Sequence, residues 1–434
     1  MILLRGGLWA AAFMLSRFVC AQWLPDTAWF WPSVRFYAYE AVGCNGFGVA
    51  EGGATFWTDL QSDALPLPFS LAILRGSYLD SSLKQEAEQG LQQLNHARLR
   101  WNYNVYARWL WRGWSSQAPV LAEVRLGRYL ETSTRFTDDA FGTLFFGNAR
   151  YAGTVAYYDK TAYGRITADY FSFSLIRKFL NKKIEFEAGA GISAGLLLRA
   201  SLFHLHQGQL FTASDGTFLD ASYAFTLTAN ADSASGGLRR VGWLSAAQLY
   251  AAARMPRKKM TFAIWANDLG VLHWGKEAYR YTADTSVRFT GIAAHNLFSP
   301  DHSNAFLSYS LDSLLNHTGA QKTEGSATVL LPARWAVAMC APVGPKWSIT
   351  AAAWYELFPA RKPELMVRPA WHGRKVTLAA IQTLGGISGF SLGADVAVRV
   401  KSFGIRAATG NLLAFLLPAK TGTAAVFLNV GYSW

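Results

Sequence analysis

The chain has 434 residues, of which 51% are hydrophobic and 15% aromatic, and its formal net charge is +13. Beyond its first residues it contains no run of ~18 uncharged apolar residues, which excludes a bundle of transmembrane helices. A chain this apolar is then either a large soluble β protein or a membrane barrel with apolar residues at alternate positions. The basic residues are scattered along expected strands and turns, a pattern that favours anionic lipid headgroups or a basic lumen over nucleic acid.

The amino terminus has the features of an export signal. Arg5 provides a positive start, an apolar run follows over 8–15, and Val19-Cys20-Ala21 resembles a signal-peptidase site. We therefore expect a signal peptide over residues 1–21, which leaves a mature chain of 413 residues (434 less 21). A lipoprotein acylated at Cys20 and an uncleaved membrane anchor are weaker alternatives.

Residues 22–99 differ in composition from the rest of the chain. They contain several prolines and a glycine cluster over 43–53, without a long alternating run. Asp80-Ser81-Ser82 precedes Leu83, Ala87 and Leu91, which predicts a capped amphipathic helix. The glycine cluster lacks the Lys-Ser/Thr of a phosphate-binding loop. We expect an N-terminal plug-like segment that fills the lumen of a barrel.

From residue 100 to 434 the pattern is that of a barrel. Trp101, Tyr103, Val105, Ala107, Trp109 and Trp111 share one face of a strand, and Asn102, Asn104 and Arg108 share the other. Aromatic residues at both ends of an apolar face are typical of membrane-interface girdles, and a polar partner face suits a wet interior. In a soluble sheet the same tryptophan face would be buried in a core.

Similar alternation recurs along the chain between short turns. It is present over 120–126, 171–175, 184–192, 260–264, 335–353 and 390–399. Strands of about ten residues joined by short turns predict an all-β fold, a transmembrane up-and-down antiparallel β-barrel. Counting hairpins gives 12 to 16 strands, with about 14 as the central value.

The last nine residues form the clearest strand. Val426, Leu428, Val430, Tyr432 and Trp434 lie on one face, opposite Phe427, Asn429, Gly431 and Ser433. A chain that stops at an aromatic residue on such a face resembles the closing strand of bacterial outer-membrane barrels. The residues expected at the membrane interface are Trp101, Trp109, Trp111, Tyr432 and Trp434.

Two stretches carry a more specific resemblance. Residues 266–274 (ANDLGVLHW), followed by 281–292, resemble an uncharacterised family of bacterial outer-membrane β-barrels, a domain of unknown function, that is distantly similar to long-chain fatty-acid transporter barrels. Residues 411–418 (NLLAFLLP) are a second similarity. The resemblance implies a 14-stranded barrel with an N-terminal lumen segment, and passage of hydrophobic solutes. The Asn-Pro-Ala element of those transporters has no counterpart near Pro66-Leu67-Pro68.

The family-like stretch supplies the candidate lumen residues Asn267, Asp268, Gly270 and Trp274. Asn, Asp and Gly favour turns and bulges, so we expect Asp268 to end a strand and Gly270 to redirect the next one. Contact between Asp268 and a ligand is the alternative.

Residues for catalysis or metal binding are sparse. His204 and His206 would share one strand face without a neighbouring carboxylate or cysteine, and Asp301-His302-Ser303 lies in a polar loop. No common hydrolase, metalloprotease or redox motif occurs. We expect no enzymatic activity, no cofactor and no metal, and we expect Cys44 and Cys340 to remain unpaired.

The leading hypothesis is a channel or transporter for small hydrophobic solutes in the bacterial outer membrane. Its expected partners are outer-membrane lipids, the barrel assembly machinery through the C-terminal strand, and small hydrophobic solutes. A non-enzymatic scaffold or surface-interaction barrel is the alternative, suggested by polar connections over 207–220, 230–239 and 299–304. A soluble periplasmic β protein is the third possibility.

Overall fold

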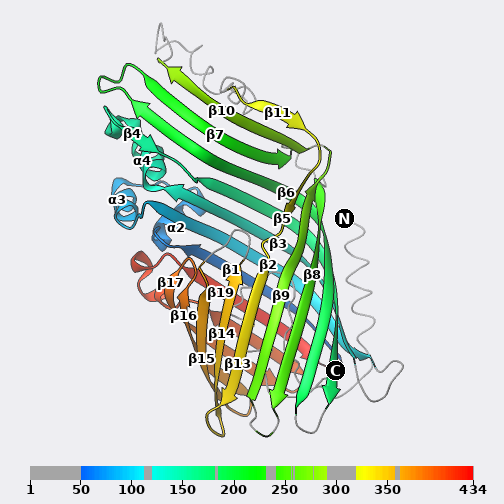
Figure 1. Cartoon of the computed structure of the whole chain (residues 1–434). Coiled ribbons are helices and arrows are strands. Elements are labelled where there is room, and N and C mark those ends of the chain that lie inside the picture. Colours follow the sequence, from blue (N-terminus) through cyan, green and yellow to red (C-terminus); the bar gives the residue numbers. More distant parts are fainter. Residues whose placement is uncertain are drawn as a thin grey trace.

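The computed structural model describes residues 50–111, 120–180, 184–230, 241–255, 257, 260–276, 278–290, 319–356 and 362–433, and its strands form one antiparallel sheet (Figure 1). The first strands are β1 (Ala50–Ser62), β2 (Leu94–Trp111), β3 (Val120–Thr137), β4 (Val155–Tyr157), β5 (Ala162–Leu180), β6 (Glu185–Thr212), β7 (Leu219–Asn230), β8 (Gly242–Met255), β9 (Met260–Trp274) and β10 (Ala278–Phe289). The remaining strands are β11 (Gln321–Glu324), β12 (Ala327–Leu330), β13 (Arg334–Pro342), β14 (Trp347–Glu356), β15 (Glu364–His372), β16 (Val376–Gly385), β17 (Gly389–Val400), β18 (Phe403–Thr409) and β19 (Ala424–Ser433). The helices are α2 (Leu67–Arg75), α3 (Ser81–Gln89), α4 (Asp138–Phe146) and α6 (Leu413–Leu416), with 3-10 turns η2 (Asn148–Tyr151) and η4 (Pro418–Lys420).

Fourteen of the described strands close into a barrel. The hydrogen-bonded ring runs β1-β2-β3-β5-β6-β8-β9-β13-β14-β15-β16-β17-β18-β19 and returns to β1. Strand β1 closes it, because Thr55 is paired with Asn104 of β2 on one side and with Asn429 of β19 on the other. The predicted all-β barrel of about 14 strands is confirmed.

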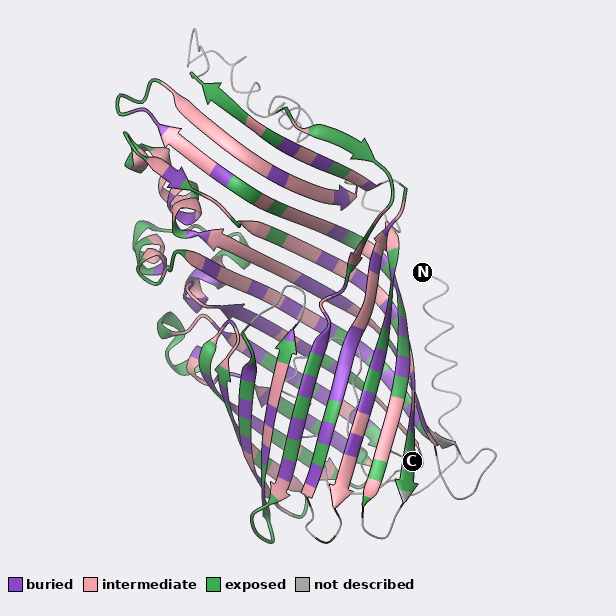
Figure 2. Ribbon diagram, in the orientation of Figure 1, coloured by how far each residue is buried: buried purple, intermediate pink, exposed green. Residues whose placement is uncertain are grey.

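Side chains alternate between the two faces of the wall, as Figure 2 shows by the alternating burial along strands of the ring such as β8 and β13. On β2, the side chain of Val105 is 56% exposed and that of Trp109 is 39% exposed. Asn102, which points to the other face of the same strand, is fully buried. On β19, Leu428 and Tyr432 are exposed and Asn429 is buried. The two predicted faces of both strands are confirmed. An apolar outward face around a closed ring of backbone hydrogen bonds is what a membrane-spanning barrel requires.

The barrel begins earlier in the chain than the sequence suggested. Residues Ala50–Ser62, which we assigned to the plug-like segment 22–99, form the first strand of the wall, so the expected boundary at residue 100 is wrong. The glycines at its start hid the strand: Gly53 lies where a Cβ would be 2.4 Å from the carbonyl oxygen of Val430. Residues 22–49 of the expected plug, and the expected signal peptide 1–21, lie outside the described residues.

The predicted capped helix exists as α3. The Asp80 side chain accepts a hydrogen bond of 2.8 Å from the backbone N–H of Leu83, the arrangement of an N-cap. This helix lies with α2 and α4 at one end of the barrel instead of in the lumen (Figure 1). None of the helices in the described part of the chain is long and apolar enough to cross a membrane.

The two ends of the barrel differ. One end carries the tight connections 343–346, 373–375 and 401–402 together with the end of β19, and we call it the turn end. The other end carries α2, α3, α4 and α6, and we call it the helix end. Strands β13 to β19 have 7 to 12 residues, whereas β2, β3, β5 and β6 have 18 to 28 and extend further at the helix end.

The extension ends in a lip of strands outside the ring. Strand β6 pairs with β8 over Glu185–Leu197 and then with β7 over Ser201–Thr212, while β7 pairs with β10 and β10 with β11. The chain order therefore departs from a simple up-and-down meander at β4, β7 and β10 to β12. The segment 207–220, expected as a loop, is mostly strand in this lip.

The point where β6 exchanges partners is filled by a tryptophan. The ladder between β5 and β6 shifts register at Thr167/Ala168, next to the exchange. Trp274 at the end of β9 is fully buried there, and its Nε1 donates to the backbone oxygen of Ala200 at 3.3 Å. Trp274 belongs to the same buried cluster as Leu197 and Leu244, so apolar side chains seal the wall where the strands diverge.

Candidate functional site

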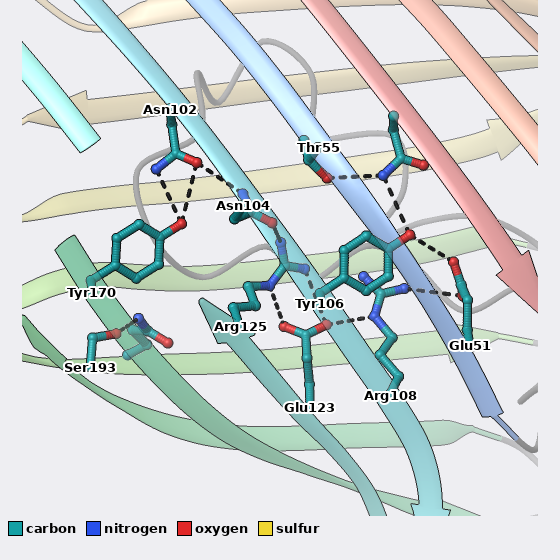
Figure 3. A network of polar contacts seen from close by, with 12 residues as sticks. Glu51, Thr55, Asn102, Asn104, Tyr106, Arg108, Glu123, Arg125, Tyr170 and Ser193 are labelled. Atoms are coloured by element: carbon teal, nitrogen blue, oxygen red, sulfur yellow. Dashed lines mark hydrogen bonds and ion pairs between the residues drawn. The ribbon is translucent and has the colours of Figure 1, made fainter. Parts of the chain in front are cut away.

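One side of the lumen is lined by charged residues. Seven charged side chains of β1 to β3 point inward, and each is at most 6% exposed. We call them the charged wall: Asp59, Arg98, Arg100, Arg108, Glu123, Arg125 and Glu131. Their alternation places them on one face, and neighbouring strands bring opposite charges together. Glu123 accepts from Nε of Arg108 at 2.5 Å and from Nε of Arg125 at 2.6 Å (Figure 3). Arg100 donates to Asp59 at 2.8 Å.

Neutral polar side chains extend this wall along the strands. Tyr106 donates to Glu51 at 2.9 Å, and its ring lies 4.8 Å from the guanidinium carbon of Arg108 (Figure 3). Asn102 donates to the Tyr170 hydroxyl at 3.1 Å and accepts from Asn104 at 2.9 Å. Buried polar groups of this kind are stable only when they are hydrogen-bonded to one another, so this part of the wall forms a fixed network.

Ion pairs cross the lumen near the helix end. Arg98 of β2 donates to Glu356 of β14 at 2.8 Å, and both side chains are less than 10% exposed. Arg334 of β13 lies 3.6 Å from Glu131 of β3 and 3.6 Å from Glu356. We call Arg98, Glu131, Arg334 and Glu356 the cross-lumen belt. Tyr129 donates a hydrogen bond to Glu131 and Gln61 accepts one from Arg98, which anchors the belt to the charged wall.

The belt joins opposite sides of the barrel. Seven steps around the ring separate β2 from β14 in either direction, so the two strands are diametrically opposed. A contact of 2.8 Å between their side chains therefore spans the whole lumen at this level. In the part of the chain that the structure describes, the belt is a side-chain bridge across the path along the barrel axis.

Opposite the charged wall, one level of the lumen is lined by small apolar residues. Registered pairs place Ala252, Ala263, Ala338 and Ala352 in one row across β8, β9, β13 and β14. Each is at most 7% exposed, and we call this row the alanine wall. Met366 of β15 continues it. At the level of this row, methyl groups line the lumen opposite the charged wall.

Asp268 lies where the alanine wall meets the belt. The ladder between β8 and β9 shifts register at Ala247/Leu249, and Asp268 has φ of +60°, so it occupies a β-bulge. Its side chain is fully buried, and among the described residues neither carboxylate oxygen has a hydrogen-bond partner. Arg334 and Arg100 attract this charge while Glu131 and Glu356 repel it. The predicted bulge is confirmed, but Asp268 does not end a strand, since β9 continues to Trp274.

The other candidate lumen residues occupy distinct positions on β9. Asn267 is buried and registered with Arg334 of the belt, next to Asp268. Gly270 permits close approach to β8, because a Cβ there would lie 2.0 Å from the carbonyl oxygen of Ser245. Trp274 seals the strand exchange described above. The sequence stretch therefore contributes two residues, Asn267 and Asp268, to the surroundings of the belt and two, Gly270 and Trp274, to the packing of the wall.

The candidate interface aromatics are partly described. Trp109 and Tyr432 face outward near the turn end and are 39% and 50% exposed. Trp101 faces outward in the middle of β2, where its ring stacks on Tyr103 with centroids 5.6 Å apart. The side chain of Trp111, and Trp434, lie outside the described residues. The assignment of these residues to a membrane interface remains a prediction.

The residues that the sequence offered for catalysis or metal binding do not form a site among the described residues. His204 and His206 lie on the lip with ring centroids 4.2 Å apart, next to Arg135, whose charge disfavours a cation. Burial and the neighbouring His206 lower the pKa of His204. Among the described residues no group of three or more metal-ligating side chains gathers. Asp301-His302-Ser303 and Cys44 fall outside the described residues, and Cys340 is buried.

Sequence reasoning did not identify the belt. Its four residues come from strands far apart in the chain, and Arg98 and Glu356 are separated by 258 positions. Their only sequence signal is a charge at the inward phase of a strand, as at Arg98, Glu131 and Arg334.

No family model and no curated protein matches the chain. Among solved structures, it is similar to a deletion mutant of the monoaromatic hydrocarbon channel TodX, with 9% identity, a TM-score of 0.46, and coverage of 94% of this chain and 92% of that chain. A FadL homologue from Pseudomonas aeruginosa shares 12% identity with a TM-score of 0.46, covering 93% and 94% of the two chains. The toluene transporter TodX of Pseudomonas putida shares 9% identity with a TM-score of 0.43, covering 89% and 90%. The chain has a distant structural resemblance to the FadL and TodX outer-membrane hydrocarbon channel barrels.

Proposed function

We propose that the protein is an outer-membrane channel for small hydrophobic solutes. The observation that carries this proposal is the row of alanines that faces the charged wall inside a closed barrel. A row of apolar side chains on one side of the lumen lets an apolar solute leave water there without stripping charged groups of their partners. A pore for ions or sugars would need a polar surface on both sides.

The belt makes this channel a gated one. Arg98 and Glu356 meet across the lumen, so a solute passes only when that contact opens. Each ion of a buried pair is costly to leave unpaired, and the closed arrangement is therefore the resting one. Gln61 already accepts a hydrogen bond from Arg98 and can keep it when the contact with Glu356 opens.

Uptake of a small apolar fluorescent probe into proteoliposomes tests the proposal. Ala338→Asp places a charge in the alanine wall and should reduce probe uptake by about tenfold, because one desolvated charge costs well over 1.4 kcal/mol. Thr350→Asp is the matched control: it adds the same charge to the lumen face of β14, where Arg368 is its registered neighbour. Equal uptake by both variants and by the unmodified protein would contradict the alanine wall as the path. Heat-modifiable gel mobility should show that each variant is folded.

Export and orientation complete the proposal. We infer cleavage after Ala21, residence in the outer membrane, and a turn end that faces the periplasm. The C-terminal strand β19, with Leu428 and Tyr432 outward, then presents its apolar face to the barrel assembly machinery and to lipid. Amino-terminal sequencing of the mature protein from an outer-membrane fraction should begin at Gln22, and recovery in the soluble fraction would contradict this localisation.

The lip favours a second function, surface interaction. Arg288 of β10 donates two hydrogen bonds of 2.7 Å to the carboxylate of Asp220 on β7, and both side chains are exposed. Such a surface on strands outside the ring fits a protein partner better than a solute. Arg288→Glu should abolish partner capture while leaving probe uptake unchanged if the scaffold function holds, whereas unchanged capture would contradict it.

A further inference from the structure

The tight turns at the turn end carry only positive charge among their described residues. Lys346, Arg374, Lys375 and Lys401 are all exposed, and Arg257 in the turn between β8 and β9 is a fifth exposed cation. No acidic residue occurs in the described parts of these turns. The helix end differs, because acids such as Asp80, Glu86 and Asp138 lie there among the cations.

Backbone hydrogen bonds hold three of these turns side by side. The N–H of His372 donates to the carbonyl oxygen of Lys346 at 2.7 Å, and the N–H of Arg399 donates to that of Lys375 at 2.8 Å. The first bond joins turn 343–346 to turn 373–375, and the second joins turn 373–375 to the strand that leads to Lys401. We call Lys346, Arg374, Lys375 and Lys401 the basic rim. Four like charges on a connected rim attract anions at short range.

An apolar groove lies on the outer wall next to this rim. It has a volume of about 620 Å³ and is lined by outward side chains of β6, β8, β9, β13, β14 and β15 together with buried residues of the same strands, among them Ala338 and Ala352. Phe262, Met339, Ala351 and Val367 form one registered row across four of these strands. The small side chains of the alanines at 251, 253, 351 and 353 leave the open space of the groove between bulkier neighbours.

The distance between groove and rim matches the geometry of a lipid. Ala351 is four residues from Trp347, which is about 13 Å along the strand at ~3.3 Å per residue. Trp347 is 53% exposed on the outer face and directly follows Lys346, so it lies where the apolar wall gives way to charge. Tryptophan prefers this depth, with headgroups on one side and acyl chains on the other.

We propose that the basic rim and this groove form a binding site for an anionic phospholipid of the leaflet facing the turn end. The phosphate lies against Lys346, Arg374 and Lys375, and an acyl chain lies in the groove along Ala351 and Met339. Charge complementarity selects the headgroup, and continuity with the lipid-facing wall selects a lipid over a soluble anion. The site does not depend on transport through the lumen.

Native mass spectrometry of the whole purified barrel, titrated with phosphatidylglycerol or phosphatidylcholine, tests the proposal. The unmodified barrel should bind phosphatidylglycerol at least about tenfold more tightly than phosphatidylcholine, because several cations of the rim attract the anionic headgroup and not the zwitterionic one. The triple variant Lys346→Gln, Arg374→Gln, Lys375→Gln should lose this preference. The matched control Arg75→Gln, Lys362→Gln, Lys420→Gln removes three exposed cations at the helix end and should keep it.

A second pair of variants tests the groove. Ala351→Leu with Ala353→Leu fills it and should weaken binding of both lipids, whereas Ala380→Leu with Ala407→Leu, on exposed outer positions elsewhere, should not. The proposal is overturned if the two lipids bind equally, or if the control triple variant loses the preference as well. The proposal is also overturned if glycerol phosphate alone displaces phosphatidylglycerol in full. The same holds if an anionic polymer binds in place of either lipid.

Discussion

The charged wall and the alanine wall follow the same alternation of inward and outward residues, yet different forces stabilise them. In the charged wall each inward side chain depends on a partner on the adjacent strand, as Glu123 does on Arg108 and Arg125. In the alanine wall each inward side chain is small and needs only an apolar neighbour. The charged wall is therefore specific and intolerant of single changes, and the alanine wall is sensitive to size.

The largest effect on stability should follow from breaking the charged wall. Glu123→Ala leaves Arg108 and Arg125 buried beside each other without their shared carboxylate, which should cost about 3–5 kcal/mol. Urea unfolding in lipid vesicles, followed by tryptophan fluorescence, measures the loss. Glu324→Ala, at an exposed glutamate of β11, is the control and should change little. Similar losses from the two variants would show that the network contributes nothing specific.

A smaller loss should follow from enlarging a residue in the alanine wall. Ala338→Leu adds volume to a packed row and should cost about 1–3 kcal/mol, because neighbouring side chains must shift. Ala353→Leu on the outward face of β14 has room in the groove and should stay within about 0.5 kcal/mol of the unmodified protein. The same unfolding assay compares them. If the outward variant proves the more damaging, the inward alanines are not packed as described.

The smallest effect should come from the bulge between the two walls. Asp268→Asn keeps a residue that tolerates positive φ and removes a buried charge without hydrogen-bond partners, so it should stabilise the barrel by about 1 kcal/mol. Asp268→Leu should instead destabilise it, since a branched side chain is strained at φ of +60°. Loss of stability in Asp268→Asn would mean that the charge is paired in the folded protein.

The sequence predicted the two faces of individual strands but not the connections between the strands. Alternation over 101–109 and 426–432 assigned inward and outward faces correctly, because a period of two is a local property of a strand. The strand Ala50–Ser62 escaped detection because three of its first residues, over 50–53, lack bulky side chains. The fork at β6 was missed as well, since the change of partner depends on pairings with β7 and β8 that no local pattern encodes.

The candidate site shows the same division. The turn-forming residues of 267–270 correctly indicated a bulge at Asp268, which is a local backbone feature. The belt was not predictable, because Arg98 meets Glu356 only after the strands between them have closed the ring. The sequence shows which charged residues point inward along a strand. It does not show which of them meet across the lumen, because that depends on how far neighbouring strands are offset along the barrel.

Single-channel conductance in planar bilayers tests the central claim that the cross-lumen belt closes the barrel. Glu356→Gln weakens the Arg98–Glu356 contact between opposite walls, and the double variant Arg98→Ala, Glu356→Ala removes that contact while Arg334 and Glu131 remain. Both should convert a nearly silent protein into one with frequent openings, the double variant more so, whereas Glu123→Gln, which alters a pair within one wall, should stay silent. Folded barrels of all variants that remain as silent as the unmodified protein would contradict the belt as the gate.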